Sequence, residues 1–161
     1  MIMLDTNVLS ESLRPAPEPR VLDWINKQAI ETLYLSAITV AELRFGAALL
    51  PSGRRKTRLR NSLENKLLPL FSGRVLPFDI TVTEAYAEVI SQARMAGQSI
   101  STADGYIAAT AAANGMIIAT RDTNPFVMSD TRDTSPFVAA GLEVVNTWEI
   151  VYPGEIQGHN T

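Results

Sequence analysis

The sequence predicts an α/β domain in which helices cover both faces of a largely parallel sheet. Short apolar segments alternate with segments of helical periodicity along the chain, which is the pattern of parallel strands joined by crossover helices. At 161 residues and 46% hydrophobic content, the chain has the size and composition of one globular domain. We expect this domain to span residues 1–149, with a polar tail over residues 150–161.

The predicted strands are short, apolar and separated by turn or helix signals. Two of them stand out: the first, near the amino terminus, leads directly into an acidic residue, and the fourth is almost wholly aliphatic. The five segments are Ile2–Leu4, Leu33–Leu35, Val75–Phe78, Met116–Ala119 and Leu142–Val145.

Helical end signals place the helices between these strands. A first helix is expected around Trp24, after a proline-rich loop. Thr39 is expected to be the N-cap of the next helix, with Glu42 completing a capping box three residues later. Two further helices are predicted at residues 83–96 and 102–114, each followed by a glycine that suits a helix C-terminus.

A basic segment interrupts an otherwise acidic chain. The net charge is −3, yet six of the fourteen Lys and Arg residues fall between residues 54 and 66. Leu59, Leu63 and Leu67 have helical spacing, so we expect an amphipathic helix that turns its leucines to the core and stops near Pro69. Its basic face is either a solvated surface or a contact for RNA or a protein partner. The candidate contact residues are Arg54, Arg55 and Arg58.

Composition excludes several kinds of chemistry. The chain has no cysteine, which rules out disulfides, thiolate zinc sites and cysteine nucleophiles. Its one histidine, His159, lies in the polar C-terminal segment, so neither a serine–histidine triad nor histidine-liganded zinc is expected. No apolar run approaches the roughly 18 residues of a membrane span, and we expect a cytoplasmic protein without membrane contact. Oxygen ligands, which suit Mg²⁺ or Mn²⁺, remain available.

Four acidic residues are expected to converge at one edge of the sheet. Asp5 and Asp122 follow predicted strands, while Glu42 and Asp104 lie in first turns of helices that could begin at the same edge. Two carboxylates about 4 Å apart repel by about 4 kcal/mol at an effective dielectric of about 20, so a cluster of acids favours a bound cation. A divalent metal there could activate a water molecule and offset charge on a phosphodiester.

Structural interpretations of the same acids stay open. Glu42 and Asp104 could be helix-capping residues only, Asp5 could form a plain Asx turn, and Asp122 could be a turn residue. Nearby hydroxyl and amide side chains could orient the acids, although such residues are also common helix caps. These candidate partners are Thr6, Asn7 and Thr120.

An eight-residue segment occurs twice, eleven residues apart. Residues 120–127 and 131–138 are identical at seven of eight positions, which indicates a local tandem duplication. Asp122 and Asp133 occupy equivalent places in the two copies. Asp122 is three residues beyond Ala119 and cannot lie more than roughly 10 Å from that strand end, so we expect it, and not Asp133, in the site.

Four motifs, in order and at suitable spacing, resemble those of PIN-domain ribonucleases, in particular the VapC and FitB-like toxins of bacterial toxin–antitoxin pairs. The resemblance covers residues 1 to about 149. It implies a PIN-like sheet flanked by helices, a Mg²⁺ or Mn²⁺ site, hydrolysis of single-stranded or looped RNA, a homodimer, and inhibition by a cognate antitoxin that reaches into the active-site groove. The motifs are Met3–Ser10, Ser36–Gly46, Thr102–Ala109 and Ile118–Asp122.

The resemblance also implies roles for individual positions. Asp5, Glu42 and Asp104 match the three acids that recur most regularly in the family, and Asp122 matches a less regular fourth. Thr6 and Thr120 match its hydroxyl-bearing neighbours.

The chain departs from the family pattern in two places. Gly105 replaces a more usual helix former, which could loosen that turn at a cost of roughly 1 kcal/mol. Pro125 and Pro136 stand where a further acid is often found, which puts a fifth carboxylate in doubt.

The resulting hypothesis is a metal-dependent endoribonuclease acting as a toxin. Asp5, Asp104 and Asp122 would hold the metal, and together with Glu42 they would position the water that hydrolyses the phosphodiester. The alternative is a non-catalytic PIN-fold module that binds RNA or protein. An Asp-x-Asp phosphatase is disfavoured because the first strand is followed by Asp5-Thr-Asn7.

Overall fold

The computed structural model describes residues 1–121 and 141–149 of the chain. The predicted polar tail over residues 150–161 lies outside the described residues. So do Asp122, Asp133, Pro125 and Pro136, which belong to the duplicated region. No helix in the described part of the chain is long and apolar enough to cross a membrane.

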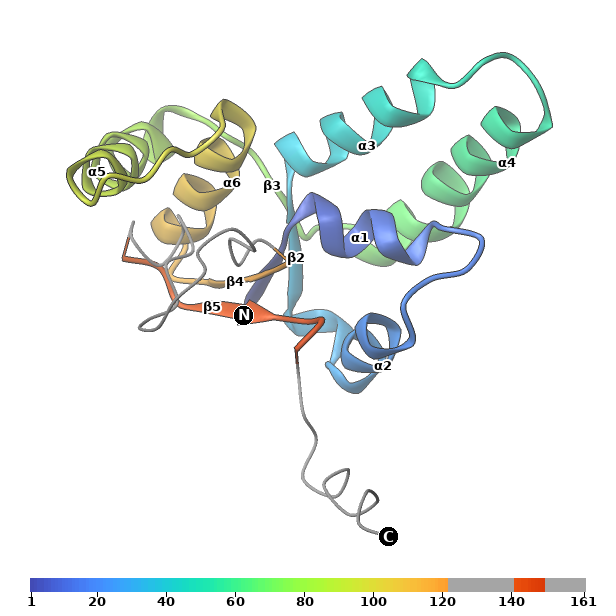
Figure 1. Cartoon of the computed structure of the whole chain (residues 1–161), viewed down its shortest axis with the longest axis horizontal. Coiled ribbons are helices and arrows are strands. Elements are labelled where there is room, and N and C mark those ends of the chain that lie inside the picture. The colour runs from blue at the N-terminus through green and yellow to red at the C-terminus, as the bar shows by residue number, and fades with distance from the viewer. Residues whose placement is uncertain (122–140, 150–161) are drawn as a thin grey trace, which may run out of the picture.

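A five-stranded, all-parallel sheet forms the centre of the molecule, which confirms the predicted fold class (Figure 1). The strand order is β3-β2-β1-β4-β5, so the first strand is central. The predicted strand at 75–78 ends after two residues because Pro77 has no N–H to donate to the ladder. The strands are β1 Ile2–Leu4, β2 Leu33–Ser36, β3 Val75–Leu76, β4 Ile117–Thr120 and β5 Val144–Asn146.

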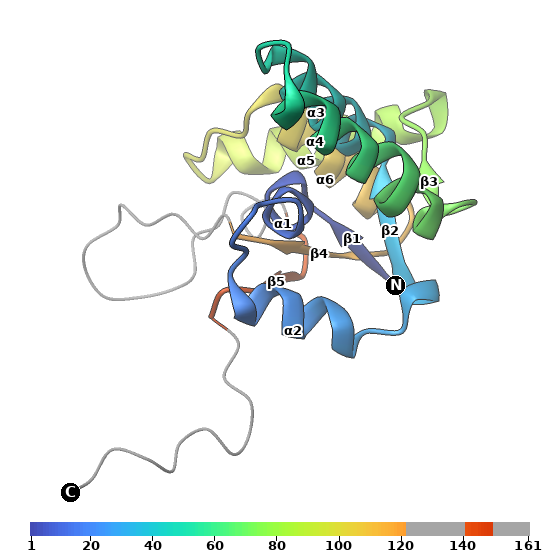
Figure 2. The same ribbon diagram turned by 90° about the vertical axis from the view of Figure 1, so that its right-hand side faces the viewer.

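Helices cover both faces of this sheet. Helices α1 and α2 share an apolar cluster with one face, and α5 and α6 share a second cluster with the other, as two perpendicular views show (Figures 1 and 2). Both predicted helix ends at Gly97 and Gly115 are confirmed, with φ angles of 74° and 62°. The six helices of the described chain are α1 Thr6–Ser12, α2 Pro19–Lys27, α3 Ala37–Leu49, α4 Arg54–Ser62, α5 Thr83–Met95 and α6 Thr102–Ala113.

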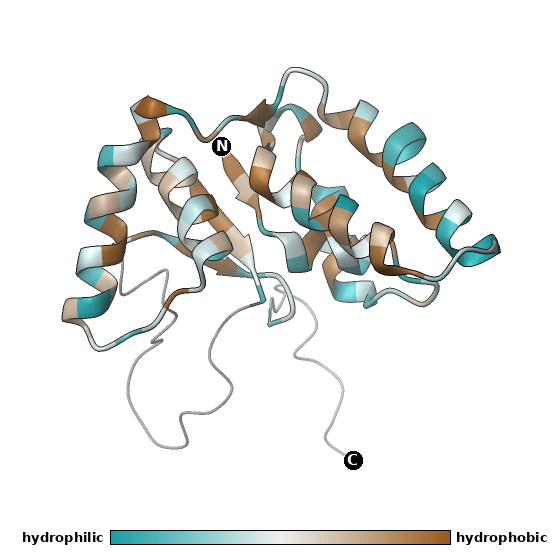
Figure 3. Cartoon of the chain, turned by 90° about the horizontal axis from the view of Figure 1, so that it is seen from above, coloured by the Kyte–Doolittle hydropathy of each residue, from teal (hydrophilic) through white to brown (hydrophobic). Residues whose placement is uncertain are grey.

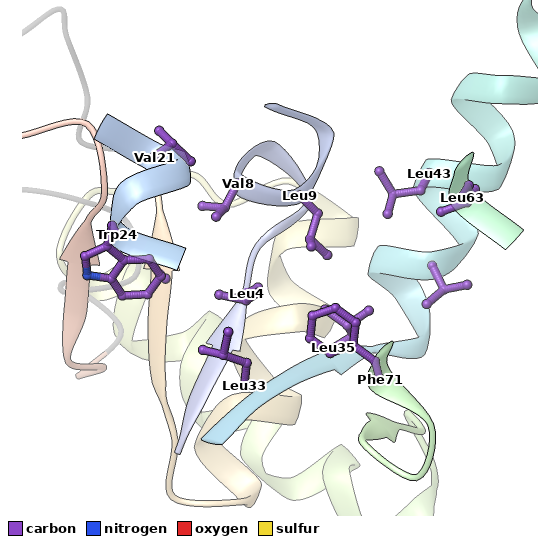
Figure 4. Packing of buried hydrophobic residues seen from close by; sticks show 12 residues of the cluster. Leu4, Val8, Leu9, Val21, Trp24, Leu33, Leu35, Leu43, Leu63 and Phe71 are labelled. Atoms are coloured by element: carbon purple, nitrogen blue, oxygen red, sulfur yellow. The ribbon is translucent and has the colours of Figure 1, made fainter. Parts of the chain in front are cut away.

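Alternation along the strands divides the core into these two clusters. In β1, Leu4 packs with the α1 and α2 side while Met3 packs with the α5 and α6 side. On the first side, Trp24 of α2 and Phe71 flank the leucines of β1 and β2 (Figure 4). The core therefore fixes β1 from both faces, which leaves its carboxyl end rigidly placed.

Helix α3 begins earlier than the sequence predicts. Its N-cap is Ser36, whose hydroxyl oxygen accepts a hydrogen bond from the N–H of Ile38 at 3.1 Å. The prediction that Thr39 caps this helix is wrong, because Ser36, the last residue of β2, already turns the chain into the helix. Glu42 consequently lies in the second turn of α3 and does not form a capping box.

The basic segment forms only part of the long amphipathic helix that we predicted. Helix α4 buries no residue and is mostly hydrophilic (Figure 3, right). Only Leu63 of the three leucines is buried, while Leu59 and Leu67 are half-buried. A π-helical turn at Leu63–Leu67 and a 3₁₀ turn at Leu68–Phe71 carry the chain past Pro69 to β3.

Gly105 does not loosen the first turn of α6, contrary to the expectation from helix propensity. It is buried, and a Cβ atom there would lie 2.9 Å from Cδ1 of Ile90 and 3.3 Å from Cε2 of Tyr86. Both of these residues belong to α5. The missing side chain therefore lets α5 and α6 approach closely, which propensity alone cannot reveal.

We predict that Gly105→Ala and Gly46→Ala have different effects on stability. Gly46 also lies inside a helix, but a Cβ atom there would have no neighbour within 4 Å. Gly46→Ala should raise the free energy of unfolding by about 0.5–1 kcal/mol. Gly105→Ala should lose this gain, because Ile90 and Tyr86 must move. Urea unfolding of both variants provides the test, and equal stabilisation would contradict the packing role of Gly105.

Candidate active site

The candidate site lies where the order of the strands reverses. The chain runs from the central strand β1 to β2 and β3 on one side, and returns to β4 and β5 on the other. In parallel sheets, such a switch point opens a crevice at the carboxyl ends of the two strands. Asp5 follows β1 there, and its N–H donates to the carbonyl of Ala119 in β4 at 2.9 Å. Thr120 ends β4 at the same place.

Three donors hold the carboxylate of Asp5. Oδ1 accepts from the N–H of Thr6 at 2.7 Å, so Asp5 is also the N-cap of α1. Oδ2 accepts from the hydroxyl of Thr120 at 2.7 Å and from Nδ2 of Asn7 at 3.1 Å. A carboxylate has about four acceptor directions. Counted over the described residues, one direction is left on Oδ1 for a ligand.

The environment of Asp5 makes its ionised form costly. Its side chain is 2% exposed, and burial is the main cause that raises its pKa to about 6. The hydrogen bonds from Thr120 and Thr6 act in the opposite direction, while the negative charges of Asp104 and Glu42 raise the pKa further. Asp104 and Glu42 are therefore close enough for their charges to act on Asp5.

Glu42 is oriented by the residue that follows Asp5. Its Oε1 atom accepts a hydrogen bond of 2.6 Å from the hydroxyl of Thr6. The neighbouring residues Asp5 and Thr6 thus connect the β1 edge to α3. One turn earlier on the same face of α3, the hydroxyl of Thr39 is buried without a hydrogen-bond partner among the described residues.

Asp104 takes part in a helix cap as well as in the acid cluster. Ser101 is the N-cap of α6; its Oγ accepts from the N–H of Asp104 at 3.2 Å and donates to Oδ2 of Asp104 at 2.6 Å. The capping interpretation of Asp104 is thus confirmed. It does not exclude a role in the site, because only Oδ2 is used and the charge still acts on Asp5.

Asn7 connects the two strand ends. Its Nδ2 donates to Thr120 Oγ1 at 3.1 Å as well as to Asp5, and its Oδ1 accepts from the N–H of Arg121 at 3.1 Å. The predicted neighbours Thr6, Asn7 and Thr120 are therefore all hydrogen-bonded within the cluster. Sequence reasoning missed Arg121, whose position beside the cluster is visible only once β4 is aligned with β1.

The donor set suits a hard divalent cation. Among residues 1–121 and 141–149, no three acidic side chains are arranged so that they could hold one ion. Magnesium does not require such a cage, because it usually keeps several waters and binds through one or two carboxylates. Asp5 has a free acceptor direction, and Asp104 has an oxygen outside its capping bond. All of these ligand atoms are oxygen, which fits Mg²⁺ or Mn²⁺.

The predicted basic contact residues are not part of this cluster. Arg54, Arg55 and Arg58 lie on α4, which forms an arm together with α3 at the upper right of Figure 1. Asp122 lies outside the described residues, so its place in the site stays a prediction.

Comparisons with known proteins agree with this geometry. Residues 2–130 match the PIN domain family. The chain is 56% identical over 149 residues to the plasmid stability protein StbB of Pseudomonas syringae pv. tomato. It is 54% identical over 149 residues to the VapC ribonuclease Y4jK of Sinorhizobium fredii. Each of these alignments covers 92% of this chain and 99% of the relative. The chain is 54% identical over 130 residues to the toxin FitB of Neisseria gonorrhoeae, covering 81% of this chain and 94% of that protein. The crystal structure of FitAcB from Neisseria gonorrhoeae superposes with a TM-score of 0.82 at 49% identity, covering 93% of this chain and 100% of that chain.

We predict that Asp5 makes the metal-free protein less stable as the pH rises. A folded-state pKa of about 6, above the unfolded value of about 3.9, means that the folded protein binds more protons between these values. The stability contribution of Asp5 is thus greatest below pH 4 and is lost as the pH rises through 6. Asn at this position does not ionise. The free energy of unfolding of Asp5→Asn minus that of the wild type should therefore increase by about 2 kcal/mol from pH 4.5 to pH 7.5.

Urea unfolding in EDTA at both pH values measures this difference. Asn is also a good N-cap, and any mismatch of its amide with Asn7 costs the same at both pH values, so it cancels in the comparison. A pH-independent difference between the two proteins would show that Asp5 has no raised pKa and acts only as a cap.

Proposed function

From the premise that this chain belongs to the PIN-domain family, we propose that it is a divalent-metal-dependent endoribonuclease and the toxin of a toxin–antitoxin pair. One observation carries the proposal. A buried carboxylate with a raised pKa, Asp5, lies at the switch point of the sheet beside two further acids, Glu42 and Asp104. A module that only binds RNA or protein has no use for such a costly anionic cluster.

Asp5 and Asp104 are the described residues that would hold Mg²⁺ or Mn²⁺, and Asp122 is the proposed third. When bound, the metal would lower the pKa of a water molecule and offset charge that develops on the phosphodiester. The chain itself supplies the orientation. Thr120 and Asn7 fix Oδ2 of Asp5, so that Oδ1 is the oxygen left for a ligand.

Glu42 is the acid best placed to handle a proton. It is half-buried, and Thr6 holds only its Oε1 atom, which leaves Oε2 to accept a hydrogen bond from the attacking water. Asp104 is held by Ser101 in the same way, through one oxygen. Glu42 and Asp104 thus each combine one restrained oxygen with a second that can accept from substrate, water or metal, whereas Asp5 accepts hydrogen bonds on both oxygens and keeps one acceptor direction on Oδ1.

The names of the relatives support the biological part of the proposal. The chain is more than half identical to proteins named VapC ribonuclease and toxin FitB, and FitAcB shares its fold along 93% of the chain. We propose that this protein likewise acts on RNA, binds a cognate antitoxin, forms a homodimer and functions in the cytoplasm. The PIN-like domain is proposed to extend to residue 149.

The arm formed by α3 and α4 is the proposed contact surface for RNA. Lys56 and Arg44 have structural partners there: Lys56 donates to the carbonyl of Ala48 at 2.9 Å, and Arg44 forms an ion pair with Glu64 at 2.8 Å. Arg54, Arg55 and Arg58, by contrast, are exposed and have no ion pair or hydrogen bond within the described part of the chain. These three arginines are therefore free to bind phosphate groups.

We predict that the purified protein cleaves RNA in Mg²⁺ or Mn²⁺, that EDTA stops cleavage, and that Asp5→Asn abolishes it while the protein stays folded. Carboxylates alone cannot generate a nucleophile from water at neutral pH, and Asn cannot replace the charge. A fluorescent single-stranded RNA measures cleavage, and circular dichroism checks the fold. Robust cleavage in excess EDTA would refute the metal dependence, and RNA binding without cleavage in any metal would favour the non-catalytic module.

We predict that replacing Arg54, Arg55 and Arg58 by Ala weakens RNA binding and flattens its salt dependence. Each lost phosphate contact should lower the slope of log K against log salt by about 0.7 on a single strand. Replacing Arg20 and Arg94 by Ala, both exposed on other helices, removes two positive charges away from α4, and comparison of the effect per charge removed controls for the lost positive charge. If the triple variant keeps wild-type affinity and slope, the basic face is a solvated or antitoxin-binding surface.

A further inference from the structure

Arg121 is anchored to the acid cluster through its backbone. It directly follows Thr120, the residue whose hydroxyl donates to Oδ2 of Asp5. Its N–H donates to Oδ1 of Asn7, the side chain that also contacts Asp5 and Thr120. Consecutive Cα atoms are about 3.8 Å apart, so Arg121 begins within one residue of the candidate site.

The side chain of Arg121 rests on an aromatic platform. Its guanidinium carbon lies 5.2 Å from the ring centroid of Trp148, within the range of a cation–π contact. Trp148 is half-buried and packs against the core cluster on the α1 and α2 side. The backbone N–H of Trp148 donates to Oδ1 of Asn146 at 3.0 Å, and Asn146 pairs with Thr120 where β5 lies beside β4. The platform is thus fixed to β4, the strand that ends immediately before Arg121.

Glu11, whose carboxylate is stabilised by the charge of Arg121, does not neutralise it by direct contact. Glu11 is buried, and its carboxylate accepts from the N–H of Glu18 at 2.8 Å and from Arg14 at 3.1 Å. Within the described ranges, no carboxylate lies within ion-pair distance of Arg121. With respect to the described residues, the exposed guanidinium therefore keeps its hydrogen-bond donors for a ligand.

We propose that Arg121 binds a phosphate group of the single-stranded RNA substrate beside the acid cluster. This inference rests on the proposed function. Three carboxylates repel an RNA strand, so a cation at the rim of the crevice is needed where the strand enters or leaves. Arginine suits this task, because its planar fork matches two phosphate oxygens and Trp148 reduces the conformational freedom lost on binding.

A purely structural role would give a different result. Arg121 could simply cover the indole of Trp148 and hold β5 in place. In that case the length of the side chain matters and its charge does not. Gln and Met are uncharged but long enough to cover the indole. Lys keeps the positive charge but lacks the planar guanidinium that binds two phosphate oxygens at once. The three substitutions separate packing from phosphate binding.

The test measures binding of a fluorescent single-stranded RNA by anisotropy, in EDTA so that the strand stays intact, at several salt concentrations. Arg121→Gln should weaken binding about tenfold, the loss expected for one charge-assisted contact. It should also lower the salt slope by about 0.7. Arg121→Lys should keep the wild-type slope. Arg94→Gln, an exposed arginine on α5, is the matched control and should change the affinity and slope far less than Arg121→Gln does.

The proposal would be overturned if Arg121→Gln kept the wild-type RNA affinity and salt slope. It would also be overturned if Arg121→Gln and Arg121→Lys lost equal amounts of affinity and of salt slope. Should the Gln variant fail to fold, Arg121→Met answers the same question with an apolar cover for the indole. If the wild type neither binds nor cleaves RNA with Mg²⁺ or Mn²⁺, the proposed function is wrong. If the wild type cleaves RNA and Arg121→Gln binds RNA as tightly as the wild type does, only the role of Arg121 is wrong.

Discussion

The burial of the Asp5 carboxylate at the meeting of β1, α1 and β4 is the constraint on which the site depends. Burial alone disfavours the charged form, and the N–H of Thr6 and the side chains of Thr120 and Asn7 only partly compensate. Glu42 and Asp104 add further negative charge. The cluster therefore carries unfavourable negative charge that a bound cation would offset. The packing of the sheet, and not the cluster itself, supplies the stability that keeps these acids together.

Several side chains serve the fold and the site at once. Asp5 caps α1, and Asp104 is locked into the cap of α6 by Ser101. A cap places a carboxylate at a helix start with little freedom, which is also what a precise ligand position requires. Capping and function are therefore not competing explanations for these two acids. Glu42 differs, because α3 is capped by Ser36 and Glu42 has no capping partner to explain its position.

Sequence patterns predicted the strands, most of the helices and a convergence of four acids, of which Asp5, Glu42 and Asp104 lie among the described residues, because these features depend on local periodicity and on parallel strand order. The errors arose where the outcome depends on neighbours. Two hydroxyl residues, Ser36 and Thr39, could each cap α3, and only the end of β2 selects between them. Gly105 looked like a weak helix position, but α5 needs the space. The sequence did not identify Arg121 as a candidate residue, because its contact with Trp148 depends on the pairing of β4 with β5.

The distribution of charge reconciles an acidic protein with the proposed RNA substrate. The chain has a net charge of −3, so no general attraction draws a polyanion to it. At physiological ionic strength, charges act over only about 8 Å, and what matters is where each cation lies. The proposed contacts occupy two separate places: the exposed arginines of α4 on the projecting arm, and Arg121 at the rim of the acid crevice. The second of these places adjoins the acids, because Thr120, the residue before Arg121, donates a hydrogen bond to Asp5.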